Sequence, residues 1–152
     1  LYKYLDFWGK WVSDVHIELK IIGLRPGTNS LNGGLSLTAF ATNHHPSSLG
    51  FRFQYQRGIY CFTGDTGPYP ELKDHLHRSD RVFIDCAKDS DQSTDNHLTV
   101  REAVGVCQTA GVRHIYLTHF YPGSLAEARQ FLKMNPQIDN VIPADDGMII
   151  QL

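Results

Sequence analysis

Before residue 63, apolar and polar positions alternate in short runs, which predicts strands joined by turns. The predicted strands cover residues 15–23, 35–41, 51–55 and 59–62. A turn at Gln56-Arg57-Gly58 joins the last two strands as a hairpin. Aromatic residues three to four apart in residues 2–11 predict a short helix, and residues 25–34, which are rich in Gly and Asn, predict a loop.

Beyond residue 62, short apolar strands alternate with segments of helical periodicity. Strands are predicted at residues 82–84, 115–117, 141–142 and 148–152, and helices at residues 71–77, 99–111 and 124–134. The last two helices each start with a capping-box pattern, Thr99 with Glu102 and Ser124 with Glu127. Hairpins followed by strand–helix units predict one α/β domain over residues 1–152, with a mixed sheet covered by helices on one face.

The composition narrows the class of protein. With 152 residues, 41% of them hydrophobic, the chain can bury one core, which excludes a disordered segment. The net charge is −2 (14 basic against 16 acidic residues), and the chain has no basic stripe. The sequence therefore does not predict binding of nucleic acid by electrostatics alone. No apolar run is long enough to span a membrane. Cys61, Cys86 and Cys107 lie in apolar runs, which predicts buried thiols in the reducing cytoplasm.

Three polar residues share a position directly beyond a predicted apolar strand: His44, Asp65 and His119. Strand ends at one edge of a sheet lie close together, so we expect these side chains to meet at a common rim. Two imidazoles and a carboxylate suit zinc, manganese or iron. The sequence therefore predicts a metal site there.

Five segments, in this order, resemble motifs of the metallo-β-lactamase-fold hydrolases, especially the ribonuclease Z and phosphodiesterase branch. In the first, His44 stands six positions before Gly50 (50 − 44 = 6), which selects it over His45 as a ligand. The others are Phe62-Thr63-Gly64-Asp65-Thr66, Asn96-His97-Leu98-Thr99, Leu117-Thr118-His119-Phe120 and Ala144-Asp145-Asp146-Gly147-Met148.

The resemblance implies a site for two metal ions, zinc above all, with manganese or iron as alternatives. His44, Asp65 and His119 would be metal ligands, with Asp65 joining two ions held about 3.5–4 Å apart. A metal-activated hydroxide would attack a phosphodiester, RNA included, or another small substrate, and His97 would protonate the leaving oxygen. His97 and Asp65 are thus the implied catalytic residues. Alternatively, His97 is an ordinary residue just before the N-cap of a helix.

Two departures from the family pattern stand out. The motif His-x-His-x-Asp-His is absent, and the nearest segment, His75-Leu76-His77, reads as an exposed helix end with two solvated histidines. We therefore expect the C-terminal half of an αββα sandwich, inactive alone, that pairs with a missing N-terminal half or with a second copy. At Phe83-Ile84-Asp85-Cys86-Ala87 the branch usually reads His-Glu-Ala, which places Asp85 on the histidine and Cys86 on the acid of a Glu-His pairing that serves proton delivery. We interpret Cys86 as a packed thiol and Asp85 as a residue that hydrogen-bonds locally.

Two other functions remain open. The chain could be a shortened relative that acts as a non-catalytic scaffold or partner-binding module, with relic residues at the three ligand positions. It could also sense redox state through Cys61 or Cys86, although neither thiol has a basic neighbour in sequence to lower its pKa.

Overall fold

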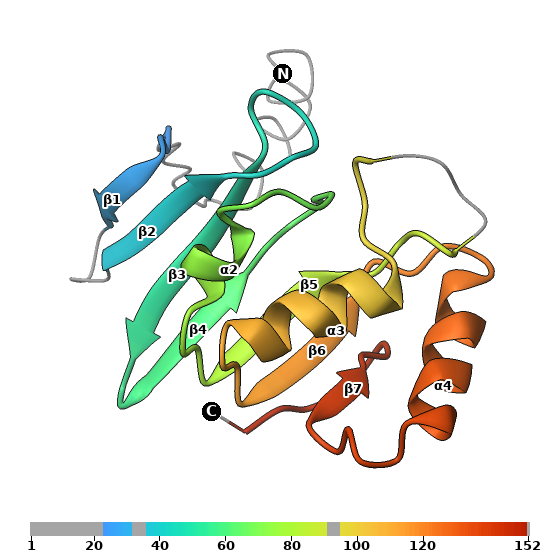
Figure 1. Cartoon of the computed structure of the whole chain (residues 1–152). Helices are drawn as coiled ribbons and strands as arrows, with labels where there is room; N and C mark the ends of the chain where they lie inside the picture. Colours follow the sequence, from blue (N-terminus) through green and yellow to red (C-terminus); the bar gives the residue numbers. More distant parts are fainter. Residues whose placement is uncertain (1–22, 32–35, 91–94, 152) are drawn as a thin grey trace, which may run out of the picture.

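The centre of the molecule is a seven-stranded sheet whose strands follow one another in chain order (Figure 1). The computed structural model describes residues 23–31, 36–90 and 95–151. The strands are β1 Gly27–Ser30, β2 Ser36–Ala41, β3 Leu49–Tyr55, β4 Gly58–Phe62, β5 Arg81–Asp85, β6 His114–Thr118 and β7 Val141–Pro143. Strands β1 to β4 pair antiparallel and β4 to β7 pair parallel, so the predicted mixed sheet is confirmed.

The described helices lie on one face of this sheet, as predicted: α2 Leu72–Leu76, α3 Val100–Thr109 and α4 Ser124–Met134 (Figure 1). Side chains alternate between the two faces of a strand, so every second strand residue points toward the helices. Buried residues such as Val82 and Ile84 of β5 pack there with Leu76 of α2 and Val104 of α3. No helix in the described ranges has the length and apolar character needed to cross a bilayer.

The opposite face carries a row of aromatic rings from neighbouring strands. Phe62 stacks on Phe53 and Phe83, with ring centroids 6.0 and 4.3 Å apart, and Phe83 stacks on Tyr116 at 4.9 Å. Phe62 is 38% exposed. Among the described residues no helix covers this row.

Helix α3 begins with the predicted capping box. The backbone N–H of Glu102 donates to Oγ1 of Thr99 at 3.3 Å, and the backbone N–H of Thr99 donates to Oε2 of Glu102 at 2.8 Å. The helix ends before Gly111, whose φ of +69° is left-handed and therefore suits glycine. The capping box therefore fixes the start of α3 and the position of the residues just before it.

The capping box predicted at Ser124 and Glu127 is wrong. The N-cap of α4 is Gly123, and no side chain caps this end. The hydroxyl of Ser124 donates to the carbonyl oxygen of Tyr121 at 3.1 Å, and Glu127 accepts from the backbone N–H of Ser90 at 2.8 Å. The serine lies one position too far into the helix, because the preceding turn ends at the glycine.

Two further predictions are wrong, and two cannot be compared. Residues 27–30, predicted as loop, form the polar strand β1, since an exposed strand needs no apolar alternation. Residues 148–151 form no strand, because the chain turns at Gly147 (φ +81°) and the Gln151 carbonyl accepts from the Arg81 guanidinium at 2.9 Å. The helix predicted at residues 2–11 and, except for Gly23, the strand at 15–23 lie outside the described residues.

Candidate metal and proton-transfer site

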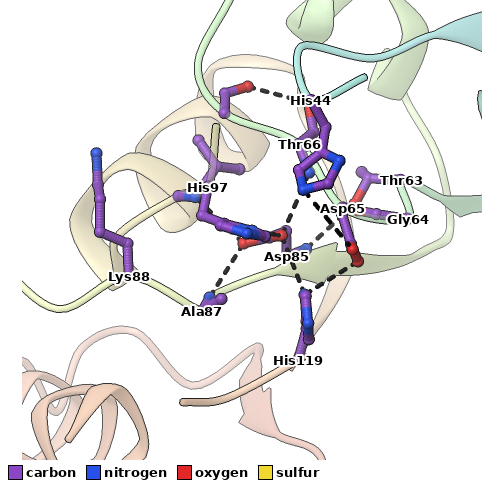
Figure 2. A network of polar contacts seen from close by, with 12 residues as sticks. His44, Thr63, Gly64, Asp65, Thr66, Asp85, Ala87, Lys88, His97 and His119 are labelled. Atoms are coloured by element: carbon purple, nitrogen blue, oxygen red, sulfur yellow. Dashed lines mark hydrogen bonds and ion pairs between the residues drawn. The ribbon is translucent and has the colours of Figure 1, made fainter. Parts of the chain in front are cut away.

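The candidate site lies where four strands that run in the same direction end. Strands β4, β5 and β6 are parallel, and β2 shares their direction because two antiparallel pairings separate it from β4. Their carboxyl ends therefore meet at one edge of the sheet. His44 follows β2, Asp65 follows β4, Asp85 ends β5 and His119 follows β6, and Figure 2 shows these side chains gathered there.

Hydrogen bonds from the side chain and the backbone of Asn43 hold three of the loops together. Its side-chain amide donates to the carbonyl oxygens of Pro68 and Asp95, both at 3.0 Å, and its carbonyl accepts from the N–H of Gly67 at 2.8 Å. A Cβ at Gly67 would lie 1.6 Å from the Asp95 carbonyl oxygen, so only glycine fits this close approach. The loops after β2 and β4 are thereby tied to the segment that leads into His97.

The carboxylate of Asp65 faces two imidazoles. Its Oδ2 lies 4.0 Å from Nε2 of His44, and its Oδ1 lies 3.0 Å from Nδ1 of His119. The side chains of His44, Asp65 and His119 are 27%, 47% and 35% exposed, so solvent or a substrate can reach all three. His119 has a φ of +61°, a left-handed conformation that is uncommon without glycine and that turns its ring toward the rim.

Behind this rim, Asp85 and His97 form a buried pair. The Nδ1 atom of His97 lies 2.7 Å from Oδ2 of Asp85, whose side chain is completely buried. The backbone N–H groups of Ala87 and Leu98 donate to Oδ1 at 3.0 and 3.2 Å, and that of Thr66 donates to Oδ2 at 3.2 Å. Because a carboxylate only accepts, Nδ1 of His97 carries the proton, and Nε2 stays available for another partner.

This pairing corrects the motif alignment that placed Cys86 on the acid, whereas the interpretation of Cys86 as a packed thiol is confirmed. The acid beside His97 is Asp85, whereas Cys86 is buried in the core under the helices. Alternation along β5 explains the difference: Asp85 points to the same side as Phe83, away from the core residue Ile84. This parity is a signal that the sequence contains, and motif matching missed it.

The segment around His75 also differs from the prediction. His77 is exposed as predicted, but His75 is only partly exposed and stacks on Phe40, with ring centroids 4.3 Å apart. Burial lowers the pKa of His75. This histidine therefore packs against the sheet.

The chemistry of the rim fits a cation. Two carboxylates face the single Nδ1 of His119, Asp65 at 3.0 Å and Asp85 at 3.4 Å, and one N–H cannot satisfy both. A bound cation would compensate these charges, and imidazole and carboxylate donors suit zinc. The donors of Asp85, His97 and His119 also lie within 4.8 Å of one another.

The two overlapping donor sets, Asp85 with His97 and His119, and Asp65 with His44 and His119, differ in how many hydrogen bonds their carboxylate already accepts. Both oxygens of Asp85 already accept backbone N–H groups. In the described structure the side chain of Asp65 contacts only the two imidazoles, and it is exposed. A metal can approach Asp65 without breaking buried hydrogen bonds.

The thiols give no support to redox sensing. Burial raises the pKa of Cys61 to about 12, and burial together with the negative charge of Asp85 raises the pKa of Cys86 to about 12. Since the thiolate is the reactive form, both groups are inert near neutral pH.

Comparison with known proteins identifies related sequences. Residues 3–120 match the protein family described as "Beta-lactamase superfamily domain". Ribonuclease Z of Mycolicibacterium paratuberculosis (strain ATCC BAA-968 / K-10) is 29% identical, over 61% of this chain and 38% of that protein.

Solved structures share the fold. The metallo-beta-lactamase fold protein YhfI from Bacillus subtilis superposes with a TM-score of 0.75 at 20% identity, over 87% of this chain and 56% of that chain. The short form of human tRNase Z superposes with a TM-score of 0.63 at 18% identity, over 96% and 63%. The chain spans less than two thirds of the length of each of these relatives.

Proposed function

The chain belongs to the beta-lactamase superfamily domain family, and we propose that it supplies part of the active site of a metal-dependent hydrolase that cleaves phosphodiesters. The observation that carries this proposal is the convergence of His44, Asp65 and His119 at one accessible edge of the sheet. The names of the ribonuclease Z relative and of the tRNase Z neighbour support a phosphodiester substrate, RNA included.

In this proposal His44, Asp65 and His119 hold divalent metal, with zinc first and manganese or iron as alternatives. Asp65, which turns one oxygen toward each imidazole, would join two ions. Bound metal lowers the pKa of a coordinated water and stabilises charge on phosphoryl oxygens. The further ligands of a two-ion site would come from the N-terminal half that we propose as the partner of this chain, and without that half the chain would be inactive.

The second proposed element is proton delivery by His97. Asp85 accepts from its Nδ1–H at 2.7 Å, so the delivered proton would be a second one, carried on Nε2, the ring atom that can meet the leaving oxygen of a substrate. The side chain of His97 is only 7% exposed, which keeps the ring in one orientation. Asp65 and His97 are thus the proposed catalytic residues.

The aromatic row on the face opposite the helices is the proposed contact with a missing N-terminal half or with a second copy of the chain. Stacked rings of which one, Phe62, is 38% exposed are typical of a surface that another layer covers. Three buried free thiols fit the reducing cytoplasm, which we include in the proposal.

Zinc content is the direct test of the ligands. We expect the purified chain to bind zinc, and His44→Ala, Asp65→Ala and His119→Ala each to weaken binding by more than about tenfold, the least that loss of a hydrogen-bond partner of a metal ligand typically costs. His114→Ala is the matched control, since His114 is exposed at the opposite end of β6. Equal zinc affinity in all four variants would contradict the assignment.

Activity tests the reaction. The chain together with the N-terminal half that we propose as its partner, which we call the longer protein, should hydrolyse bis(para-nitrophenyl) phosphate when loaded with zinc, whereas the isolated chain should not. If both hold less than one zinc per chain, and His119→Ala leaves folding and partner binding unchanged, the non-catalytic scaffold is the correct function.

A further inference from the structure

Tyr121 lies against the two histidines of the rim. Its hydroxyl oxygen is 3.4 Å from Nε2 of His97, the ring nitrogen that Asp85 leaves available. The ring of Tyr121 stands nearly edge-on to those of His97 and His119, with centroids 5.4 and 5.3 Å away. The residue belongs neither to the ligand set nor to any motif identified in the sequence.

The turn that carries Tyr121 is firmly held. Its backbone N–H donates to Oγ of Ser124 at 2.9 Å, and the same hydroxyl donates back to the Tyr121 carbonyl at 3.1 Å. Ser124 is buried at 2% exposure. Tyr121 is itself 40% exposed, so a fixed backbone places a solvent-accessible phenol over the rim.

We infer that Tyr121 is a positioning residue that orients His97 toward the leaving oxygen of the substrate. One hydrogen bond, from Nδ1 to Asp85, fixes one point of the imidazole, and a second bond at the opposite nitrogen fixes the plane of the ring. At 3.4 Å the second bond is long for a hydroxyl. In the protonated ring that delivers the proton, Nε2–H donates to the Tyr121 oxygen, so the leaving oxygen of a substrate can replace that oxygen as acceptor at small cost. This inference rests on the proposed function for the identity of the leaving oxygen, but the contact between Tyr121 and His97 does not.

A metal-free measurement tests the contact. In Tyr121→Phe the ring and its packing remain and only the hydroxyl is lost. We expect the ¹⁵N signal of His97 Nε2 to shift as it loses a hydrogen bond, while the Nδ1 signal stays in place. Tyr55→Phe is the control, because Tyr55 lies at the far end of β3. An Nε2 signal that moves no more than in the control would overturn the inference.

Kinetics of the zinc-loaded longer protein test the role. For a diribonucleotide, whose leaving group is a ribose alkoxide, Tyr121→Phe should lower kcat roughly 3- to 10-fold with KM unchanged, the effect of about one hydrogen bond. For bis(para-nitrophenyl) phosphate, whose leaving group needs no proton, kcat should stay unchanged. Equal losses on both substrates would overturn the positioning role.

The two failures are distinguishable. If the unmodified, zinc-loaded protein hydrolyses neither substrate, the proposed function fails. The His97 signal in the metal-free chain then decides alone whether Tyr121 positions that ring.

Discussion

Asp85 is the residue on which the geometry of the rim depends most. Its carboxylate is buried and accepts four N–H groups, from His97, Thr66, Ala87 and Leu98. These donors come from the loops after β4 and β5 and from the segment before α3. One side chain therefore sets the positions of three segments that are distant in sequence.

Replacing this carboxylate should be costly. In Asp85→Asn, two of the four donors would face an amide NH₂, because each oxygen accepts two of them, so we expect a loss of about 2 kcal/mol in the free energy of unfolding. Urea denaturation measures it, with the exposed Asp139→Asn as control. A loss no larger than in the control would show that the buried carboxylate is dispensable.

At the scale of elements, the start of helix α3 determines where His97 lies. Thr99 caps the helix only two residues after His97, and Glu102 of the same cap also contacts Lys88, with Oε2 and Nζ 3.5 Å apart. The capping box thus connects the first turn of α3 to the loop after β5.

Loss of the cap should destabilise the helix and loosen this connection. We expect Thr99→Ala to reduce the free energy of unfolding by about 1 kcal/mol, as for other N-cap threonines. Thr109→Ala, at the exposed end of the same helix, should change it by less than about 0.5 kcal/mol. Urea unfolding of both variants checks this, and equal effects would count against the cap.

At the scale of the whole molecule, burial of the thiols makes the free energy of unfolding change with pH in the alkaline range. Burial raises the pKa of Cys61 and Cys86 to about 12, and it raises the pKa of Cys107 as well. Above the ordinary thiol pKa of 9.0 the unfolded chain releases these protons and the folded chain keeps them. The folded state then binds more protons, so stability falls as pH rises.

We therefore expect Tm to fall steadily from pH 9 to pH 11, in step with the release of protons by the unfolded thiols. Cys61→Ala should make this fall shallower, because one proton-binding difference is removed. Calorimetry across this range measures both slopes. A Tm that stays constant, or the same slope in the variant, would mean that the thiols ionise freely in the folded protein.

Local patterns in the sequence determined most of the elements. Period-two alternation located β2 and β3, a hairpin turn located β4, and short apolar runs located β5 and β6. The Thr99–Glu102 pair marked the start of α3, because all these signals depend only on neighbouring residues. The positions of His44, Asp65 and His119 after strands were sufficient to predict that they meet, since strands of one direction end at one edge.

Other features required the tertiary structure. The exposed polar strand β1 has no local apolar signal, and Ser124 hydrogen-bonds the Tyr121 turn instead of capping α4. The partnership of Asp85 with His97, and the place of Tyr121 beside them, depend on which loops pack together across the rim. Contacts between residues distant in the chain are set by the packing of the whole sheet, and no run of neighbouring residues encodes them.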